Sequence, residues 1–488
     1  MNNDVYGAGM DSFTPRPRPA WVAGLPEQGT DTLVVHHPYD GSEVATVAVP
    51  GPEQVERAVA TAAAVAREFR RRPAHQHAAV LDHVSRALAE RAEEVAEIIT
   101  AESGKPLAWS AVEVERAVSV FRIAAEEAVR FDGELRRLDS TEAGEGRMAM
   151  VRRVPHGPVL GIAPFNFPLN LVAHKVAPAL AVGAPIVVKP APRTPLSALV
   201  LGEILAETDL PDGSFSVLPL GNEATSALVA DPRLPVVSFT GSVPVGWSIA
   251  ESVPRKQVVL ELGGNAAAVV LADWPDLAGA ARRIATFGTY QGGQSCIAVQ
   301  RVIVERAVAS RFLPLLEQAM RELRTGDPYD DTVTVGPVVD EAAAERIVAW
   351  IEEAVSAGAR VLCGGSRSGT TVEPTLLADV PPTAKVWAEE VFGPVLAVSV
   401  ADSADEAFAA VNDSRYGLQA GVFTRDLPLA MRASEELEVG GVIIGDVPSY
   451  RADAMPYGGV KDSGVGREGV RSAMADFTAV RTTVLPAR

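Results

Sequence analysis

Four short apolar runs, separated by segments of helical character, constrain the fold of this chain more than any other feature. The runs are rich in β-branched residues and are bounded by glycine and proline, which favours buried strands. Because strands that alternate with helices form βαβ units, the pattern predicts a parallel sheet with helices on its faces. The four runs are 158–163, 185–188, 235–239 and 257–262.

A second alternating block begins after Cys296. It contains an apolar run at 301–305, helical segments near 307–324 and 340–358, and the segment RVLCGG at 360–365. A chain of 488 residues also exceeds the size at which a single hydrophobic core stops growing. We therefore expect two α/β domains.

Other segments are predicted to lie outside these two blocks. Residues 53–72 and 77–100 have apolar positions at helical spacing. Residues 133–138 and 146–154 are expected to form an exposed hairpin, and 477–486 a terminal strand. Strands with free edges often pair between subunits, which suggests a homo-oligomer.

Composition excludes several classes of partner and setting. A formal charge of −18 opposes attraction to nucleic acid or to anionic membranes. Two cysteines provide no disulfide framework, which is typical of a cytoplasmic protein. Residues 1–20 are expected to be a polar arm and not a signal peptide. The apolar window 169–188 contains Lys175 and is predicted to be buried in protein, and no His or Cys cluster suggests a metal site.

A polar side chain stands at or just after the end of each of the four runs. These side chains are Asn166, Lys189, Ser242 and Glu261. Ligands of open α/β sheets bind beyond the carboxyl ends of the strands, so these four groups together favour a binding or catalytic site. The alternative for any one of them is that loops are polar in general.

The segment at 238–253 is predicted to be a strand, a glycine turn and the start of a helix. Its backbone amides suit a phosphate or pyrophosphate, with the Ser242 hydroxyl as a further donor. The middle glycine of the dinucleotide-binding pattern is absent between Gly241 and Gly246, so an ordinary turn is the alternative.

Cys296 is a candidate nucleophile. It follows Gly292 and Gly293, which we expect to let a substrate approach the sulfur closely, and a nearby donor is expected to lower its pKa. The alternative is a buried small hydrophobic residue, which suits Cys363. A hydrolase with a Cys–His pair remains open, although no histidine shares a motif with Cys296.

Motifs over nearly the whole chain resemble those of the aldehyde dehydrogenase superfamily, and the lactaldehyde-dehydrogenase-like branch is the most similar. Nine of them occur in the order typical of that family. They are ESGKP (102–106), GIAPFNFP (161–168), VVKPAP (187–192), FTGSVPVG (239–246), LELGGN (260–265), GQSCIA (293–298), EEVFGP (389–394), NDSRYGL (412–418) and MPYGGVKDSGVGREG (455–469).

The resemblance implies an α/β fold with a Rossmann-like cofactor domain, a second α/β catalytic domain and a small β element for oligomerisation. A homodimer or homotetramer is expected. The implied ranges are 1–20 for an N-terminal arm, 21–131 and 155–262 for the cofactor-binding domain, 263–470 for the catalytic domain, and 132–154 and 471–488 for the oligomerisation strands.

The resemblance also implies roles for the catalytic residues of an oxidoreductase. Cys296 would attack an aldehyde, and the Asn166 amide and the Cys296 backbone N–H would hold the resulting oxyanion. Glu261 would then activate water to release the acid. Members that use coenzyme A in place of water tend to lack this base, so a non-acylating enzyme is expected.

The implied cofactor is NAD or NADP. Lys189 is expected at the adenosine ribose, Ser242 at the pyrophosphate, and Glu390 with Phe392 at the nicotinamide ribose. Many NAD-using members have Glu where this chain has Pro192, and the neighbouring Arg193 could pair with a 2′-phosphate; NAD is favoured slightly. The other expected cofactor contacts are Ile162, Ala163, Pro164, Phe165, Arg193, Gly221, Phe239, Gly241, Val245 and Leu262.

Arg451 and Phe167 are the expected substrate contacts. An arginine at Arg451 could bind an anionic or hydroxylated head group, whereas surface pairing with Asp446 or Asp453 is the alternative. The predicted function is NAD(P)-dependent oxidation of a small aldehyde of lactaldehyde, glycolaldehyde, phosphonate or sulfonate type. A cofactor-independent thiol esterase and a non-catalytic binding protein are the competing hypotheses.

Overall fold

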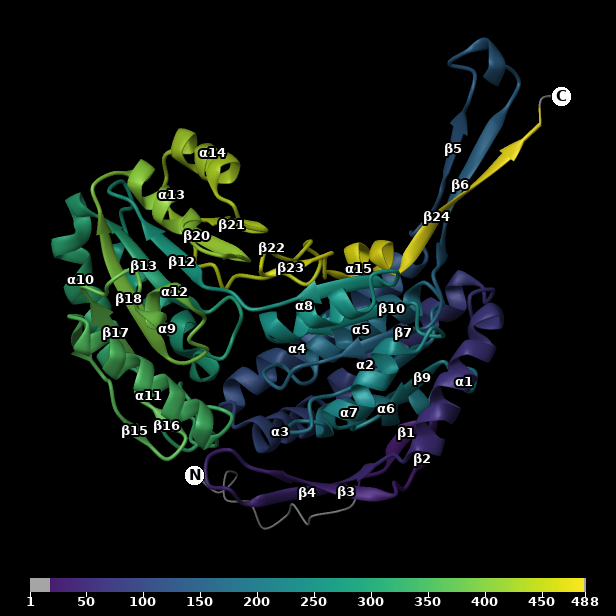
Figure 1. Cartoon of the computed structure of the whole chain (residues 1–488), viewed down its shortest axis with the longest axis horizontal. Helices are drawn as coiled ribbons and strands as arrows, with labels where there is room; N and C mark the ends of the chain where they lie inside the picture. The colour runs from purple at the N-terminus through teal and green to yellow at the C-terminus, as the bar shows by residue number, and fades with distance from the viewer. Residues whose placement is uncertain (1–17, 487–488) are drawn as a thin grey trace, which may run out of the picture.

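The computed structural model describes residues 18–486, so the polar arm expected at 1–20 falls almost entirely outside the described residues. The described chain forms two α/β lobes and a β arm that projects from one of them (Figure 1). Within this part of the chain, no helix is both long enough and apolar enough to cross a membrane.

An eight-stranded sheet forms the first lobe, and its centre is parallel, as predicted. The order is β2-β1-β9-β8-β7-β10-β11-β23, with antiparallel pairing only at β1–β2, β1–β9 and β11–β23. Its strands are β1 (Ala20–Val22), β2 (Leu25–Glu27), β7 (Val159–Ile162), β8 (Ile186–Lys189), β9 (Phe215–Val217), β10 (Val236–Thr240), β11 (Gln257–Glu261) and β23 (Gly464–Val465).

Both faces of this sheet are buried. Val159 packs into one hydrophobic cluster and its neighbour Leu160 into another, because successive residues of a strand point to opposite faces. This explains why the four runs are apolar throughout and not alternating. The covering helices are α1 (Pro52–Phe69), α2 (Ala74–Glu90), α3 (Ala92–Ser103), α4 (Leu107–Ala128), α5 (Asn170–Ala181), α6 (Leu196–Ala206), α7 (Asn222–Ala230) and α8 (Val243–Ser252).

The helical spacing at 77–100 is confirmed, and the segment contains two helices. Arg91 lies between α2 and α3 with φ −104° and ψ 21°, outside the helical geometry. The apolar spacing continues across this break, so the periodicity gave no sign of it.

Strand order reverses between β7 and β10. The chain runs from β7 through β8 to β9 on one side, and then returns to place β10 and β11 on the other side. Such a reversal opens a crevice at the carboxyl ends of the two strands, which is where open α/β sheets bind ligands.

A seven-stranded sheet forms the second lobe, in the order β14-β17-β18-β13-β12-β20-β21. The predicted run at 301–305 belongs to β13, and the two predicted helices are α10 and α11. The elements are β12 (Ala266–Val270), α9 (Leu277–Thr289), β13 (Val299–Glu305), α10 (Arg306–Arg321), α11 (Glu341–Ser356), β14 (Arg360–Cys363), β17 (Thr375–Ala378), α12 (Lys385–Ala388), β18 (Val395–Ala401), α13 (Ala404–Asn412), β20 (Gln419–Phe423), α14 (Leu427–Glu436) and β21 (Gly441–Ile444).

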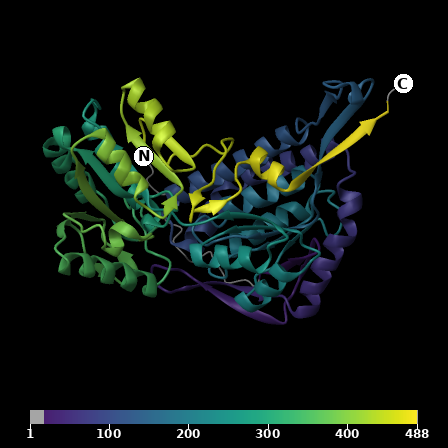
Figure 2. The ribbon, with the colours of Figure 1, turned by 45° about the horizontal axis from the view of Figure 1, so that its top comes forward.

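The projecting arm is a three-stranded antiparallel sheet of β5 (Glu134–Arg137), β6 (Met148–Pro155) and β24 (Thr478–Leu485). Both views show it extending away from the lobes (Figures 1 and 2). The predicted hairpin and terminal strand are therefore confirmed. Pairing of the arm between subunits stays a prediction.

The chain returns from the second lobe to the first near its end. β23, which the predicted boundaries assign to the catalytic domain, pairs with β11 of the first sheet, and α15 (Val470–Asp476) packs against α5. The boundaries themselves stay a prediction. The remaining paired strands are β3 (Asp31–His36) with β4 (Glu43–Val49), β15 (Arg367–Ser368) with β16 (Thr371–Val372), and β19 (Tyr416–Gly417) with β22 (Val460–Lys461).

Candidate active site

Cys296 lies between a turn of 3-10 helix (Tyr290–Gly293) and strand β13, and its side chain is partly buried. Its Sγ atom is 3.0 Å from the hydroxyl oxygen of Tyr457. Burial raises the pKa of the thiol to about 12, and the hydrogen bond to Tyr457 opposes that rise. The expectation of a lowered pKa is therefore wrong: a donor is present, but burial outweighs it.

The glycines before Cys296 serve backbone packing, which corrects the expectation that they admit the substrate. Gly293 has φ +71°, and a Cβ atom there would lie 2.1 Å from the carbonyl oxygen of Gly393. At Gly264, a Cβ atom would lie 2.2 Å from the carbonyl oxygen of Cys296 itself. Three segments of backbone thus meet behind the thiol, and no side chain fits between them.

Asn166 follows β7 and is buried against the segment that carries the thiol. Its Nδ2 atom donates a hydrogen bond of 2.9 Å to the carbonyl oxygen of Gln294, two residues before Cys296. A side-chain amide carries two N–H groups, so a second donor remains for a ligand. The structure therefore brings these two predicted residues together.

Glu261 is the last residue of β11 and is 3% exposed. Within residues 18–486, neither of its carboxylate oxygens has a hydrogen-bond partner. Burial raises the pKa of Glu261 well above its usual value, and the negative charge of Glu468 adds to that rise. Arg451 and Lys175 act in the opposite direction.

Beside Glu261 lies a group of buried charges that the sequence analysis missed. Lys175 on α5 places its Nζ atom 3.0 Å from Oε1 of Glu468 and donates to the Thr240 hydroxyl at 2.7 Å. Arg451 places Nη2 3.0 Å from Oε2 of the same carboxylate. Burial alone would raise the pKa of Glu468, but the two cations hold it below its usual value. We call Lys175, Glu261, Arg451 and Glu468 the charge cluster.

A signal for Lys175 was present in the sequence: it is a lysine inside an otherwise apolar helix, where it needs a buried partner. Tyr457 and Glu468 lie in the motif at 455–469, but their contacts were not predicted, because this segment follows β21 in largely irregular chain whose path the sequence pattern does not predict.

Arg451 is not paired at the surface, so the alternative partners Asp446 and Asp453 are wrong. Asp446 binds Arg283, and Asp453 binds Arg116. The side chain of Arg451 is only 6% exposed, and its guanidinium lies 3.8 Å from the centre of the Tyr457 ring. Its Nε atom is buried without a partner among the described residues.

Two further polar side chains are buried on one face of α5. Oδ1 of Asn170 and Nδ1 of His174 have no partner among the described residues. Nε2 of His174 is 3.4 Å from the Asp453 carboxylate, and burial lowers the pKa of His174 to about 4. Phe167 is the other predicted substrate contact, and the centroid of its ring lies 6.4 Å from the centroid of the Tyr290 ring.

The carboxyl ends of β8 and β10 fit a dinucleotide. Lys189 ends β8, where burial lowers its pKa to about 8 and no charged partner opposes that shift. Ser242 begins α8 at the strand reversal, and its hydroxyl does not cap the helix, so the hydroxyl and the first N–H groups of α8 are free to bind a phosphate.

Glu390 connects the second lobe to the end of β11. Its Oε1 atom accepts a hydrogen bond of 3.0 Å from the backbone N–H of Gly264, and burial raises the pKa of Glu390 to about 7. Phe392 has φ +49° and meets Phe165 edge-on, with ring centroids 5.9 Å apart. The predicted nicotinamide-side residues therefore lie close to Glu261.

The other predicted cofactor contacts occupy the same edge of the first sheet. Arg193 is mostly exposed and places Nη2 2.7 Å from the carboxylate of Asp340, which caps α11. Phe239 packs against Gly241, and Leu262 against Gly246. Ile162, Ala163 and Pro164 end or follow β7, Gly221 precedes α7, and Val245 is exposed on α8.

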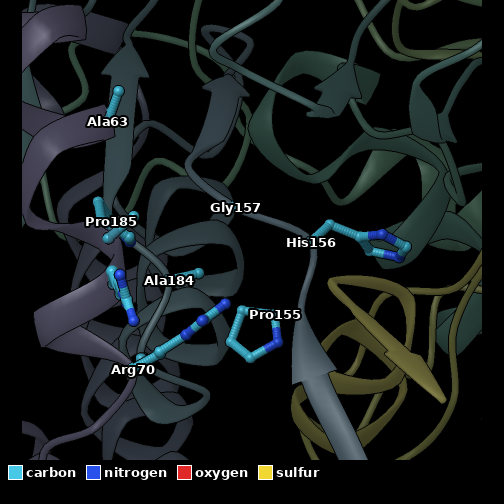
Figure 3. Close-up of a pocket in the computed structure, with 10 residues that line it drawn as sticks. Ala63, Arg70, Pro155, His156, Gly157, Ala184 and Pro185 are labelled. Carbon is cyan, nitrogen blue, oxygen red and sulfur yellow. The ribbon is translucent and has the colours of Figure 1, made fainter. Parts of the chain in front are cut away.

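The cavity in Figure 3 is not this site. It is lined in part by His156, Gly157 and Pro185, which stand just before β7 and β8, and by Arg70, which follows α1. It therefore lies at the amino ends of these strands, whereas Asn166, Lys189 and Glu261 lie at the carboxyl ends.

Comparison with known proteins agrees with this geometry. The profile described as "Aldehyde dehydrogenase family" matches residues 25–483. The chain belongs to the aldehyde dehydrogenase family.

The relatives also agree with the predicted branch and cofactor. A 3-sulfolactaldehyde dehydrogenase of Priestia aryabhattai is 41% identical over 95% of this chain and 97% of its own. A lactaldehyde dehydrogenase of Methanococcus maripaludis is 36% identical over 80% and 83%. A solved structure of an NADP-dependent glyceraldehyde-3-phosphate dehydrogenase from Bacillus halodurans, complexed with NADP, is also similar to this chain. The two have a TM-score of 0.93 and 35% sequence identity, over 97% of this chain and 100% of the other.

These findings confirm the predicted α/β fold, the likeness to the lactaldehyde dehydrogenase branch, and an oxidoreductase that uses NAD or NADP.

The packing behind the thiol predicts the effect of Gly293→Ala. The added methyl group would meet the Gly393 carbonyl and would also force alanine into a left-handed conformation. We expect a loss of about 3 kcal/mol or more in the free energy of unfolding, measured by denaturant titration.

Gly369→Ala is the matched control, because Gly369 has φ +57° and open space around its Cβ position. It should lose only about 1 to 2 kcal/mol. Equal losses for the two variants would contradict the close packing behind Cys296.

Proposed function

We propose that this enzyme oxidises a small anionic or hydroxylated aldehyde to the free carboxylic acid through a thiohemiacetal and a thioester on Cys296. The observation that carries the proposal is that Glu261, a buried carboxylate without a hydrogen-bond partner in the described chain, stands at the strand edge that also holds Asn166, whose amide bonds to the segment that carries the thiol. A base without a fixed partner is available to bind water.

In the first step, the Cys296 thiol releases its proton to solvent water as the sulfur forms a bond to the aldehyde carbon. The carbonyl oxygen becomes an alkoxide. The free N–H of the Asn166 amide and the backbone N–H of Cys296 would donate to it, and donors fixed before the reaction stabilise such a charge without reorganisation.

Oxidation of the thiohemiacetal carbon needs a hydride acceptor, which a bound nicotinamide would supply. Lys189, Ser242 with the first amides of α8, and Glu390 would hold the cofactor. Pro192 offers no carboxylate to repel a 2′-phosphate, and an anion there would compete with Asp340 for Arg193. Both NAD and NADP therefore remain compatible with this site.

In the last step, Glu261 removes a proton from water as the oxygen attacks the thioester carbon, and the thiolate leaves. The cations of the charge cluster favour the ionised form of Glu261, whereas burial and Glu468 favour the protonated form. This balance lets the carboxylate take up and release a proton, which supports hydrolysis and a non-acylating enzyme.

The polar atoms without partners favour a hydroxylated substrate. Asn170 Oδ1 can accept from a hydroxyl group, and so can Nδ1 of a neutral His174 whose Nε2–H faces Asp453. Arg116 and Arg451 add positive charge nearby, with Phe167 as an apolar wall. Sulfolactaldehyde, lactaldehyde and glyceraldehyde 3-phosphate, which the relatives' names contain, are hydroxylated aldehydes.

We also propose a homodimer or homotetramer in the cytoplasm. The arm exposes apolar side chains, among them Leu135, Val480 and Val484, that a second copy of the chain would cover. Both cysteines are free, as in a reducing compartment.

A panel of short aldehydes with NAD and with NADP tests the proposed function. We expect substrate-dependent absorbance of reduced nicotinamide, strongest for aldehydes with a hydroxyl and an acidic group, and none above background for Cys296→Ala. Ester turnover without any aldehyde oxidation would instead select the thiol esterase. No turnover of either kind by folded protein would indicate a binding protein.

Glu261→Gln should separate the two halves of the reaction. Formation of the thioester does not use Glu261, whereas its hydrolysis does. We therefore expect a burst of reduced nicotinamide, followed by steady-state turnover that is slowed about 100-fold or more. Mass spectrometry should detect the acyl group on Cys296. A variant that turns over at the normal rate without a burst would contradict the assignment of Glu261.

A further inference from the structure

Tyr457 is the one side chain outside the three proposed catalytic residues that bonds directly to the reacting sulfur in the described chain. Its hydroxyl lies 3.0 Å from Cys296 Sγ, and the residue is 3% exposed. The two residues are 161 positions apart in sequence. Buried polar groups generally have a hydrogen-bond partner. In the described chain, the partner of the buried Tyr457 hydroxyl is the Cys296 sulfur.

The Tyr457 ring is fixed from two sides. The backbone of Tyr457 forms two hydrogen bonds with that of Glu468. The Tyr457 N–H donates to the Glu468 carbonyl oxygen at 2.9 Å, and the Glu468 N–H donates to the Tyr457 carbonyl oxygen at 2.6 Å. The Arg451 guanidinium lies over the ring, 3.8 Å from its centre, and binds the Glu468 carboxylate. The hydroxyl is therefore held at the sulfur before any substrate binds.

Tyr457 keeps its proton in this setting. Burial raises the pKa of its hydroxyl well above the usual value, and the neighbouring Cys296 adds to the rise. A protonated phenol beside a thiolate can only donate, because a thiolate has no proton to give.

We propose that Tyr457 is a further catalytic residue, whose hydroxyl donates a hydrogen bond to the Cys296 thiolate and stabilises it for attack on the aldehyde. The proposal concerns the same site as the proposed function and rests on Cys296 being its nucleophile. Once the sulfur is ionised, Tyr457 is its donor, and it is not the base that takes the thiol proton.

This role opposes the cost of burying a thiolate. Substrate chemistry needs a desolvated sulfur, but desolvation disfavours the ionised form. Hydrogen bonds to charged groups are stronger than those between neutral groups, so a single well-placed hydroxyl offsets part of the desolvation penalty. The arginine that fixes the Tyr457 ring also binds Glu468, so one side chain supports the environments of both the nucleophile and the base.

Alkylation of Cys296 by iodoacetamide tests the proposal without aldehyde or nicotinamide. In Tyr457→Phe the thiol pKa should rise by about 1 to 2 units, because a hydrogen bond to a charged group is lost. A more basic thiolate is also more nucleophilic, which offsets part of the change, so the rate at a fixed pH below the thiol pKa should fall roughly 3- to 10-fold. Peptide mass spectrometry resolves Cys296 from Cys363.

Tyr290→Phe is the matched control. Tyr290 is also a buried tyrosine of this site, but its hydroxyl donates to the Ser295 Oγ atom and not to the sulfur. The alkylation rate of Cys296 in this variant should stay within about twofold of the unmodified protein. Alkylation of Cys363, which is buried at the end of the edge strand β14, should be unchanged in both variants and reports intact folding.

A slower rate in Tyr457→Phe across pH 7 to 10, with the Tyr290→Phe rate and the Cys363 rate unchanged, would support the proposal. Equal or faster alkylation of Cys296 in Tyr457→Phe would overturn it. If Tyr457→Phe misfolds, Tyr457→His, which keeps a donor, supplies the second comparison: alkylation no faster than in a folded Tyr457→Leu would overturn the donor role.

The two proposals fail separately. Loss of the alkylation effect would remove the role of Tyr457 while aldehyde oxidation by Cys296 remained. The expected alkylation effect without any aldehyde turnover would instead refute the proposed function.

Discussion

The burial of one carboxylate between two cations is the interaction on which the rest of this site depends. Glu468 is nearly inaccessible, and it keeps its charge only because Lys175 and Arg451 bind it. A buried charge without partners would be strongly destabilising, so the three side chains have to be placed together. Burial raises the pKa of Glu261, and the same charges modulate that rise; Arg451 also lies over the ring whose hydroxyl contacts Cys296.

Topology explains why these residues meet. The reversal of strand order between β7 and β10 opens the crevice for the cofactor, and the parallel strands deliver Asn166, Lys189 and Glu261 to one edge. The second lobe then contributes Cys296 and Glu390. Finally, β23 brings the segment with Tyr457 and Glu468 back against β11 (Figure 1). Neither lobe holds the complete set of reacting groups.

The sequence predicted the parallel sheets, the arm and the residues at strand ends, because apolar runs and their ends are local features. It did not predict the charge cluster, since the pairing of Lys175 with Glu468 spans 293 positions and depends on the return of the chain. Glycine was interpreted wrongly at Gly293 for a related reason: its neighbour is the distant backbone of Gly393. The direction of the Cys296 pKa was also missed, because burial is a property of the assembled lobes.

The central claim is that the charge cluster tunes Glu261 as the base of the hydrolytic step. The most direct measurement is the pH dependence of thioester hydrolysis in a single turnover of Glu468→Gln. Removing the repelling carboxylate while leaving Lys175 and Arg451 should lower the pKa of Glu261, so the rise of the rate with pH should move to lower pH. An unchanged midpoint, or a shift to higher pH in folded protein, would contradict the account.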